Sequence, residues 1–122
     1  MIAALALIVA LAQSAVHLTI HPWTGSDLQT ASSDAVKYRL EVAGKPGAAV
    51  RLTAHKVATG WIAAFCTPKV CSPGQVALDL PDSGGIVLQF ELIREAADAP
   101  HHTGATITET GGASVIVPAA AR

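Results

Sequence analysis

The sequence predicts an all-β protein that folds as one antiparallel β-sandwich of seven to eight strands. Short segments alternate apolar with polar residues, which is the period of a half-buried strand. Clusters of glycine, proline, aspartate and serine separate these segments, as expected of turns. No segment repeats its apolar residues at the spacing of a helix, and a chain of 122 residues suits a single domain.

Residues 1–15 form a predicted signal peptide, and residues 16–122 form the predicted domain. An unbroken apolar run covers Ile2 to Ala12 and precedes the segment Gln13–Ala15, which supplies the small residues that signal peptidase requires. The run is shorter than the ~20 residues that a membrane span needs. We therefore expect a secreted or periplasmic protein with no stable membrane anchor after cleavage. Because no lysine or arginine precedes the run, a retained helix or strand is the alternative.

The predicted strands begin with Val16 to Ile20, which is followed by an irregular connection from Pro22 to Ser33. The clearest strand is Val36 to Val42, where apolar residues alternate with three charged ones, so that one face is expected to be buried and the other exposed to solvent. The further strands expected along the chain are Val50–Val57, Trp61–Cys66, Val76–Leu80, Ile86–Ile93, Ala105–Thr110 and Ser114–Val117.

The core of this sandwich is expected to be aliphatic. Hydrophobic residues make up 51% of the chain but aromatic residues only 4%, so valine, isoleucine and leucine must fill most of the interior. Trp61 is the largest predicted core residue. Without its leader the chain is about 107 residues long, and a run of strands without helices at this length favours an immunoglobulin-like sandwich.

The stretch from Gly60 to Pro100 resembles the immunoglobulin-like accessory domains of bacterial secreted and surface proteins, including the type associated with α-galactosidases. The Gly60-Trp61 strand start, the Pro73-Gly74 turn and the loop proline Pro100 occupy matching places. The similarity covers roughly residues 36–118. It implies an immunoglobulin-like fold and a location outside the cytoplasm, and because those domains share no common active site it implies little about function.

Cys66 and Cys71 are separated by four residues in a loop that contains Pro68. In an exported chain this spacing predicts a local disulfide. Thioredoxin-like redox chemistry uses Cys-x-x-Cys at the start of a helix, and neither feature is present. A cupredoxin-type copper loop is rejected because Lys69 stands where a histidine ligand is needed and Met1 is the only methionine.

The candidate binding residues are Lys69 and Val70, which the predicted disulfide loop would display at its tip. A loop that is ordered before binding loses less entropy when a partner docks. The alternative is a braced turn that binds nothing.

The histidines give weaker candidate metal ligands, which are His17, His101 and His102. Cleavage after Ser14 would place a free amine two residues before His17, an arrangement that binds Cu(II) in a square plane. His101 and His102 are adjacent in a polar loop. The alternative is that all five histidines, which include His21 and His55, are ordinary surface residues.

Charge and residue pattern argue against several functions. The formal net charge is −1 with no run of either sign, so no basic stripe is present for nucleic acid. The serines show no nucleophile elbow, and Asp79 and Glu91 fall on the outward phase of their strands, where solvated charges are expected. We therefore expect no enzyme activity and no cofactor.

The function that the sequence favours is a non-catalytic secreted or periplasmic module that binds a partner protein or a cell-surface component. One alternative is self-assembly into a surface or fibre subunit through the strand Val16 to Ile20. The other alternative is a periplasmic copper- or nickel-binding protein. The ligand itself is not predicted.

Overall fold

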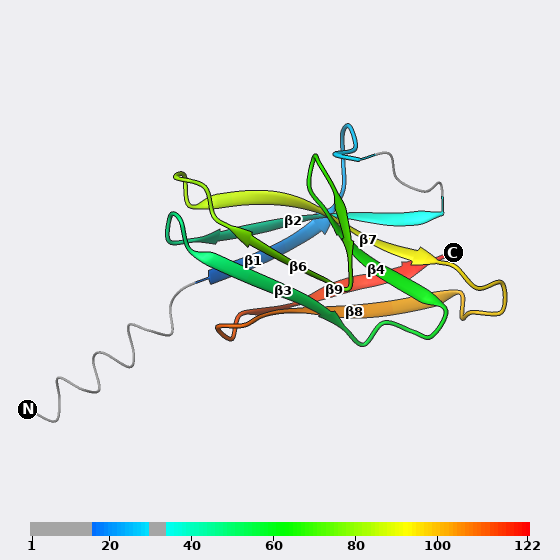
Figure 1. Ribbon diagram of the computed structural model, residues 1–122. Coiled ribbons are helices and arrows are strands. Elements are labelled where there is room, and N and C mark those ends of the chain that lie inside the picture. Colours follow the sequence, from blue (N-terminus) through cyan, green and yellow to red (C-terminus); the bar gives the residue numbers. More distant parts are fainter. Residues whose placement is uncertain (1–15, 30–33) are drawn as a thin grey trace, which may run out of the picture.

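The computed structural model describes residues 16–29 and 34–122, and every regular element in this part of the chain is a β-strand (Figure 1). Nine strands form two antiparallel sheets that pack as a sandwich, which confirms the predicted fold class. The predicted leader, residues 1–15, lies outside the described residues. The strands are β1 Val16–Pro22, β2 Ala35–Gly44, β3 Ala49–His55, β4 Trp61–Cys66, β5 Cys71–Pro73, β6 Gln75–Asp79, β7 Gly85–Arg94, β8 His102–Glu109 and β9 Ser114–Ala121.

The order of the strands is that of an immunoglobulin fold with an insertion. Sheet A has the order β1-β2-β7-β4-β5, and sheet B has the order β6-β3-β8-β9. The runs β1-β2-β7-β4 and β3-β8-β9 match strands A-B-E-D and C-F-G of the constant-type immunoglobulin sandwich. Strands β5 and β6 are the insertion, because they lie between the fourth and fifth strands of that pattern.

Alternation on β2 and β7 builds the centre of the core. Tyr38 lies opposite Phe90, and Leu40 lies opposite Leu88, so the inward faces of the two strands are in register. The ring of Phe90 also packs against that of Phe65 on β4, with 5.0 Å between the ring centroids. As predicted, the rest of the core is mainly aliphatic and includes Trp61: Val42, Val50, Leu52, Trp61, Val76, Leu80, Leu92, Ile107 and Val117.

Gly74 carries the chain from one sheet to the other. Its N–H donates to the carbonyl of Ala63 in sheet A, and its own carbonyl accepts from the N–H of Ala54 in sheet B, each at 2.9 Å. Its φ of +74° is a conformation that glycine adopts without steric cost. The sequence did not predict β5, because a strand of three residues is too short to show alternation.

Polar contacts close the sandwich around its core. The Tyr38 hydroxyl donates to the carbonyl of Pro118 on β9 at 2.7 Å, which joins the two sheets, and burial raises the pKa of this phenol. The Trp61 indole N–H donates to the carbonyl of Pro100, also at 2.7 Å. Trp61 thus combines core burial with a satisfied polar atom, as buried tryptophans usually do.

The closing hairpin is longer than the sequence predicted. Strand β8 begins at His102 rather than at Ala105, and β9 continues to Ala121 rather than ending at Val117. Thr103 pairs with Ala120 but Ala105 pairs with Val117, so the register shifts here and the extra residue of this bulge lies on β9. The bulge interrupts the alternation of β9 after Val117, so the last residues of that strand do not read as a strand in the sequence. The first residues of β8, His102 to Gly104, include no hydrophobic residue and therefore resemble a loop in the sequence.

Replacing Phe90 with alanine should lower the free energy of unfolding by about 3–5 kcal/mol, because the ring is fully buried against two other aromatic rings. Urea unfolding followed by tryptophan fluorescence measures the change. The control is Ile116→Ala, at a side chain that is 79% exposed, where a change within about 0.5 kcal/mol is expected. Equal losses in both variants would contradict this description of the core.

Candidate functional site

The predicted disulfide is present at the base of the β4–β5 hairpin. Cys66 and Cys71 are directly opposite each other on the two strands, and their sulfurs are bonded at 2.06 Å. Cys66 is fully buried on the outer face of sheet A, whereas Cys71 is exposed. The bond therefore closes the hairpin immediately below its turn.

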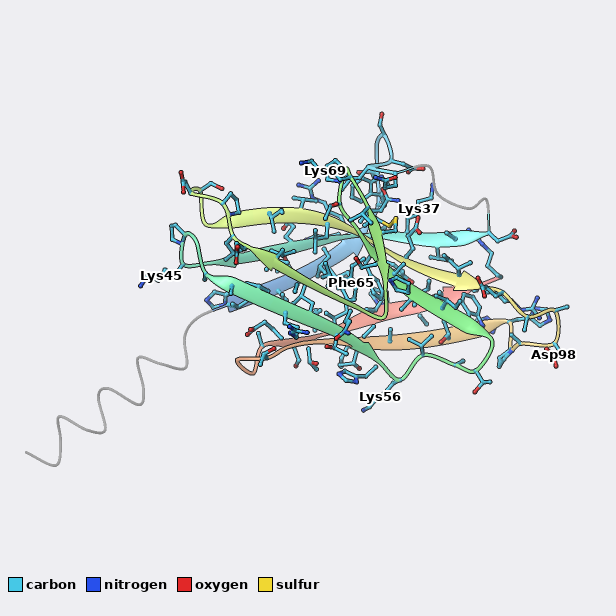
Figure 2. All side chains as sticks on the ribbon, in the orientation of Figure 1. Lys37, Lys45, Lys56, Phe65, Lys69 and Asp98 are labelled. Atoms are coloured by element: carbon cyan, nitrogen blue, oxygen red, sulfur yellow. A yellow bond between two sulfur atoms is a disulfide. The ribbon has the colours of Figure 1, made fainter. Side chains whose placement is uncertain are left out.

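The hairpin tip, residues 67–70, is ordered by its own hydrogen bonds. The N–H of Thr67 donates to the carbonyl of Val70 at 2.8 Å. The Thr67 hydroxyl accepts the N–H groups of Lys69 and Val70, each at 3.2 Å. Lys69 and Val70 are exposed at this tip, with Val70 at 55%, and Figure 2 shows Lys69 at the end of the hairpin.

A segment that follows β1, residues 23–29, lies beside the hairpin and is here called the strap. The side-chain amide of Gln29 donates to the carbonyls of Thr67 and Pro68, at 3.2 and 2.6 Å. At the other end of the strap, the N–H of Trp23 donates to the carbonyl of Lys37 at 3.1 Å. An ion pair of 2.9 Å between Asp27 and Lys37 ties its middle to β2. The strap thus braces the hairpin tip from the side.

Beneath this arrangement lies a buried polar pair on β7. Gln89 is 0% exposed and Glu91 is 4% exposed, although both point away from the core. The N–H of Leu28 in the strap donates to Gln89 Oε1 at 2.8 Å, and Gln89 Nε2 donates to Glu91 Oε1 at 3.0 Å. The expectation that Glu91 is a solvated surface charge is therefore wrong. The sequence correctly placed Glu91 on the outward face of its strand, but this part of the outer face is covered. Asp79 is exposed as expected.

Glu91 also lies beside the disulfide. On the outer face of sheet A, Gln89 is opposite Cys66, and Glu91 is opposite Ala64. One carboxylate oxygen of Glu91 and the sulfurs of Cys66 and Cys71 all lie within 4.8 Å of one another. Sequence reasoning missed this grouping because it depends on the pairing of β4 with β7, and no local motif records that pairing.

The structure does not bring the candidate histidines together. His17 lies on β1, whereas His102 is the first residue of β8 and His101 directly precedes it. The two strands begin at opposite ends of the sandwich (Figure 1). His101 Nδ1 is 2.8 Å from the carbonyl of Arg122. Among the described residues, the group of three or more potential metal ligands is Cys66, Cys71 and Glu91, with no histidine in it.

A small exposed charge cluster joins β1 to β2. Arg39 Nε donates to Glu41 at 2.9 Å, and the Thr19 hydroxyl donates to the same carboxylate at 3.1 Å. These two hydrogen bonds, Arg39 first, lower the pKa of Glu41. His21 Nε2 lies 3.8 Å from this carboxylate. The carboxylate is thus engaged by its neighbours, and nothing in this cluster forms a cavity.

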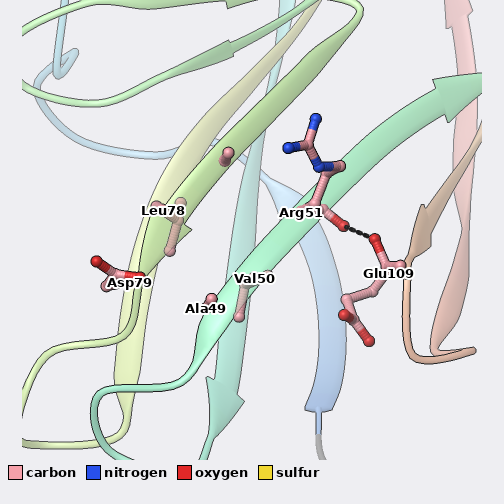
Figure 3. Close-up of a pocket in the computed structure, with 8 residues that line it drawn as sticks. Ala49, Val50, Arg51, Leu78, Asp79 and Glu109 are labelled. Carbon is pink, nitrogen blue, oxygen red and sulfur yellow. Dashed lines mark hydrogen bonds between the residues drawn. The ribbon is translucent and has the colours of Figure 1, made fainter.

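A shallow groove of 410 Å³ lies on sheet B, between β6, β3 and the turn that follows β8 (Figure 3). The Arg51 side chain stands at its edge, together with the carboxylates of Asp79 and Glu109. Glu109 Oε1 accepts the N–H of Gly111 at 2.8 Å, so this carboxylate holds the β8–β9 turn. The groove could not be predicted from the sequence, because its residues come from three separate strands and a turn.

Comparisons with known proteins support the fold of this chain and say nothing of its function. No protein family matches the chain, and no curated protein matches it either. Among solved structures, a FixG-related protein from Vibrio parahaemolyticus is similar with a TM-score of 0.54 and 11% identity, over 88% of this chain and 95% of that one. A DUF4466 family protein from Parabacteroides merdae has a TM-score of 0.38 and 10% identity, over 84% of this chain and 42% of that one. The first similarity supports the sandwich fold. The second has too low a TM-score to support any conclusion.

Replacing both cysteines with alanine should lower the free energy of unfolding by about 2 kcal/mol, because the bond closes a loop of only a few residues. Urea unfolding of the variant measures the loss, and wild-type protein that has been reduced should show a similar one. A loss well above this value in the variant, but not in the reduced protein, would mean that packing of Cys66 matters more than the cross-link.

Proposed function

We propose that this chain is a non-catalytic exported module that binds a partner protein or a cell-surface component through the hairpin tip. The observation that carries the proposal is the double bracing of that tip. The Cys66–Cys71 bond holds its base, and Gln29 holds its backbone from the side. A surface that is already ordered loses little conformational entropy on binding.

The chemistry of the tip fits a partner that offers an acidic group beside an apolar one. Val70 presents an exposed aliphatic side chain, and Lys69 next to it presents an ammonium group. A cation on the rim of a contact speeds encounter and orients the partner, while the apolar side chain supplies the burial.

Export is supported by the disulfide, because such bonds persist mainly in oxidising compartments. Among the described residues, no helix has the length and apolar content that a membrane crossing requires. The resemblance to accessory domains of bacterial secreted and surface proteins agrees with the same proposal.

Changing Lys69 to glutamate together with Val70 to aspartate should weaken partner binding at least about tenfold, since both contacts of the tip are lost. The measurement is surface plasmon resonance against envelope proteins that the wild-type chain retains. The matched control is Lys45→Glu with Ile116→Asp, which removes an exposed lysine and an exposed aliphatic side chain elsewhere. Equal binding by wild type and the tip variant would contradict the proposal.

Self-assembly is the second candidate, because β1 is an edge strand of sheet A. An edge strand offers unpaired backbone groups to a neighbouring copy. In that case light scattering would show a molar mass that rises with protein concentration, and the tip variant would assemble as the wild type does. A binding module gives a constant monomer mass instead.

A further inference from the structure

The carboxylate of Glu91 is buried without an opposite charge beside it. Glu91 is only 4% exposed. No lysine, arginine or histidine within residues 16–29 and 34–122 forms an ion pair with it. Buried charges in proteins are normally paired with another charge or coordinate a metal. The sulfurs of Cys66 and Cys71 both lie within 4.8 Å of one oxygen of this carboxylate.

The surroundings of Glu91 hold this carboxylate in place. Gln89, which is fully buried, donates its side-chain amide to Glu91 Oε1 and accepts the N–H of Leu28 from the strap. Metal-binding carboxylates are characteristically oriented by such a second layer of hydrogen bonds. The strap, Gln89 and Glu91 thus form a chain of contacts that ends beside the two sulfurs.

From this arrangement we infer that Cys66, Cys71 and Glu91 form a binding site for a thiophilic divalent cation of the Zn²⁺ type once the disulfide is reduced. Two thiolates and one carboxylate are a ligand set that Zn²⁺ accepts, and the fourth tetrahedral position is left for water. The inference goes beyond the proposed binding function and does not depend on it.

The reduction step needs a dithiol reductant. The dithiol supplies two electrons and two protons to the sulfur–sulfur bond, which breaks to give two thiols, while the reductant closes to its own disulfide. Binding of Zn²⁺ then forms two zinc–sulfur bonds and one zinc–oxygen bond, and the two thiol protons pass to solvent. The charge of the metal does not change.

The exposure of the two cysteines gives both reagents a route to the site. Cys71 is exposed, so a reductant can attack its sulfur from solvent, whereas Cys66 is fully buried beside Glu91. A cation that enters past Cys71 would meet the buried thiolate and the carboxylate behind it. The metal would also join β4 to β5, so the hairpin would remain closed after the covalent bond is lost.

Titration with Co²⁺ tests the site, because its spectrum reports the ligands. The protein is reduced with dithiothreitol, freed of reductant under anaerobic conditions, titrated with Co²⁺ and then displaced with Zn²⁺. We expect one equivalent of Co²⁺ to give a thiolate-to-cobalt charge-transfer band and the visible bands of a four-coordinate ion. Oxidised protein should give neither. No uptake by the reduced protein, or equal uptake by the oxidised protein, would overturn the inference.

The role of the carboxylate is tested by Glu91→Gln, which keeps the shape of the side chain and removes its charge. Affinity for Zn²⁺ should fall at least about tenfold while the charge-transfer band remains. The matched control is Glu95→Gln, which removes an exposed carboxylate just beyond the same strand and should leave affinity unchanged. Equal affinity in the wild type and Glu91→Gln would show that the carboxylate is not a ligand.

If Glu91→Gln fails to fold, X-ray absorption of the Zn²⁺-loaded wild type decides the question. Two sulfur ligands together with oxygen ligands at one zinc would support the site. Four sulfur ligands would mean that two copies share the metal through their thiolates alone, and would overturn the inference.

Discussion

The structure depends on β7 being covered on both of its faces. Leu88, Phe90 and Leu92 point into the core, and Gln89 and Glu91 on the other face are also buried. A strand in this position must pair its polar side chains internally, because water does not reach them. The strap meets that requirement through Leu28, whose N–H holds Gln89, and Gln89 in turn holds Glu91. The position of the strap beside the hairpin follows from the same contacts.

The sequence was a good guide to the strands and a poor guide to what covers them. Alternation in β2 and β7 located both strands and their inward faces, because that pattern is set by burial of a single face. The two cysteines were close enough in sequence for their bond to be predicted. Glu91 was placed on the correct face of its strand, but its burial arises from the strap and hairpin, which are distant in sequence. Strand β5 was missed because three residues are too few to show alternation, and the end of β9 was missed because a bulge disturbs its period of two. The start of β8 was missed because it includes no hydrophobic residue.

The candidate site shows the same division between local and distant information. Lys69 and Val70 could be assigned to the hairpin tip from the sequence, since a short loop between bonded cysteines exposes its middle residues. The contact of Gln29 with the backbone of that tip could not be predicted, because Gln29 is separated from Thr67 by 38 positions and from Pro68 by 39. The grouping of Glu91 with the cysteines likewise required the register of β4 against β7.

Gly74 has a mechanical consequence for the molecule. Because its peptide groups are bonded to both sheets, β5 and β6 form one continuous run, and the cross-linked hairpin is fastened to the edge of sheet B as well as to sheet A. A pull on the tip would therefore be shared between both layers instead of peeling one strand from one edge. The opposite side of the sandwich, where β1 and β9 are the terminal strands, has no covalent cross-link among the described residues. Under tension, the molecule should yield there first.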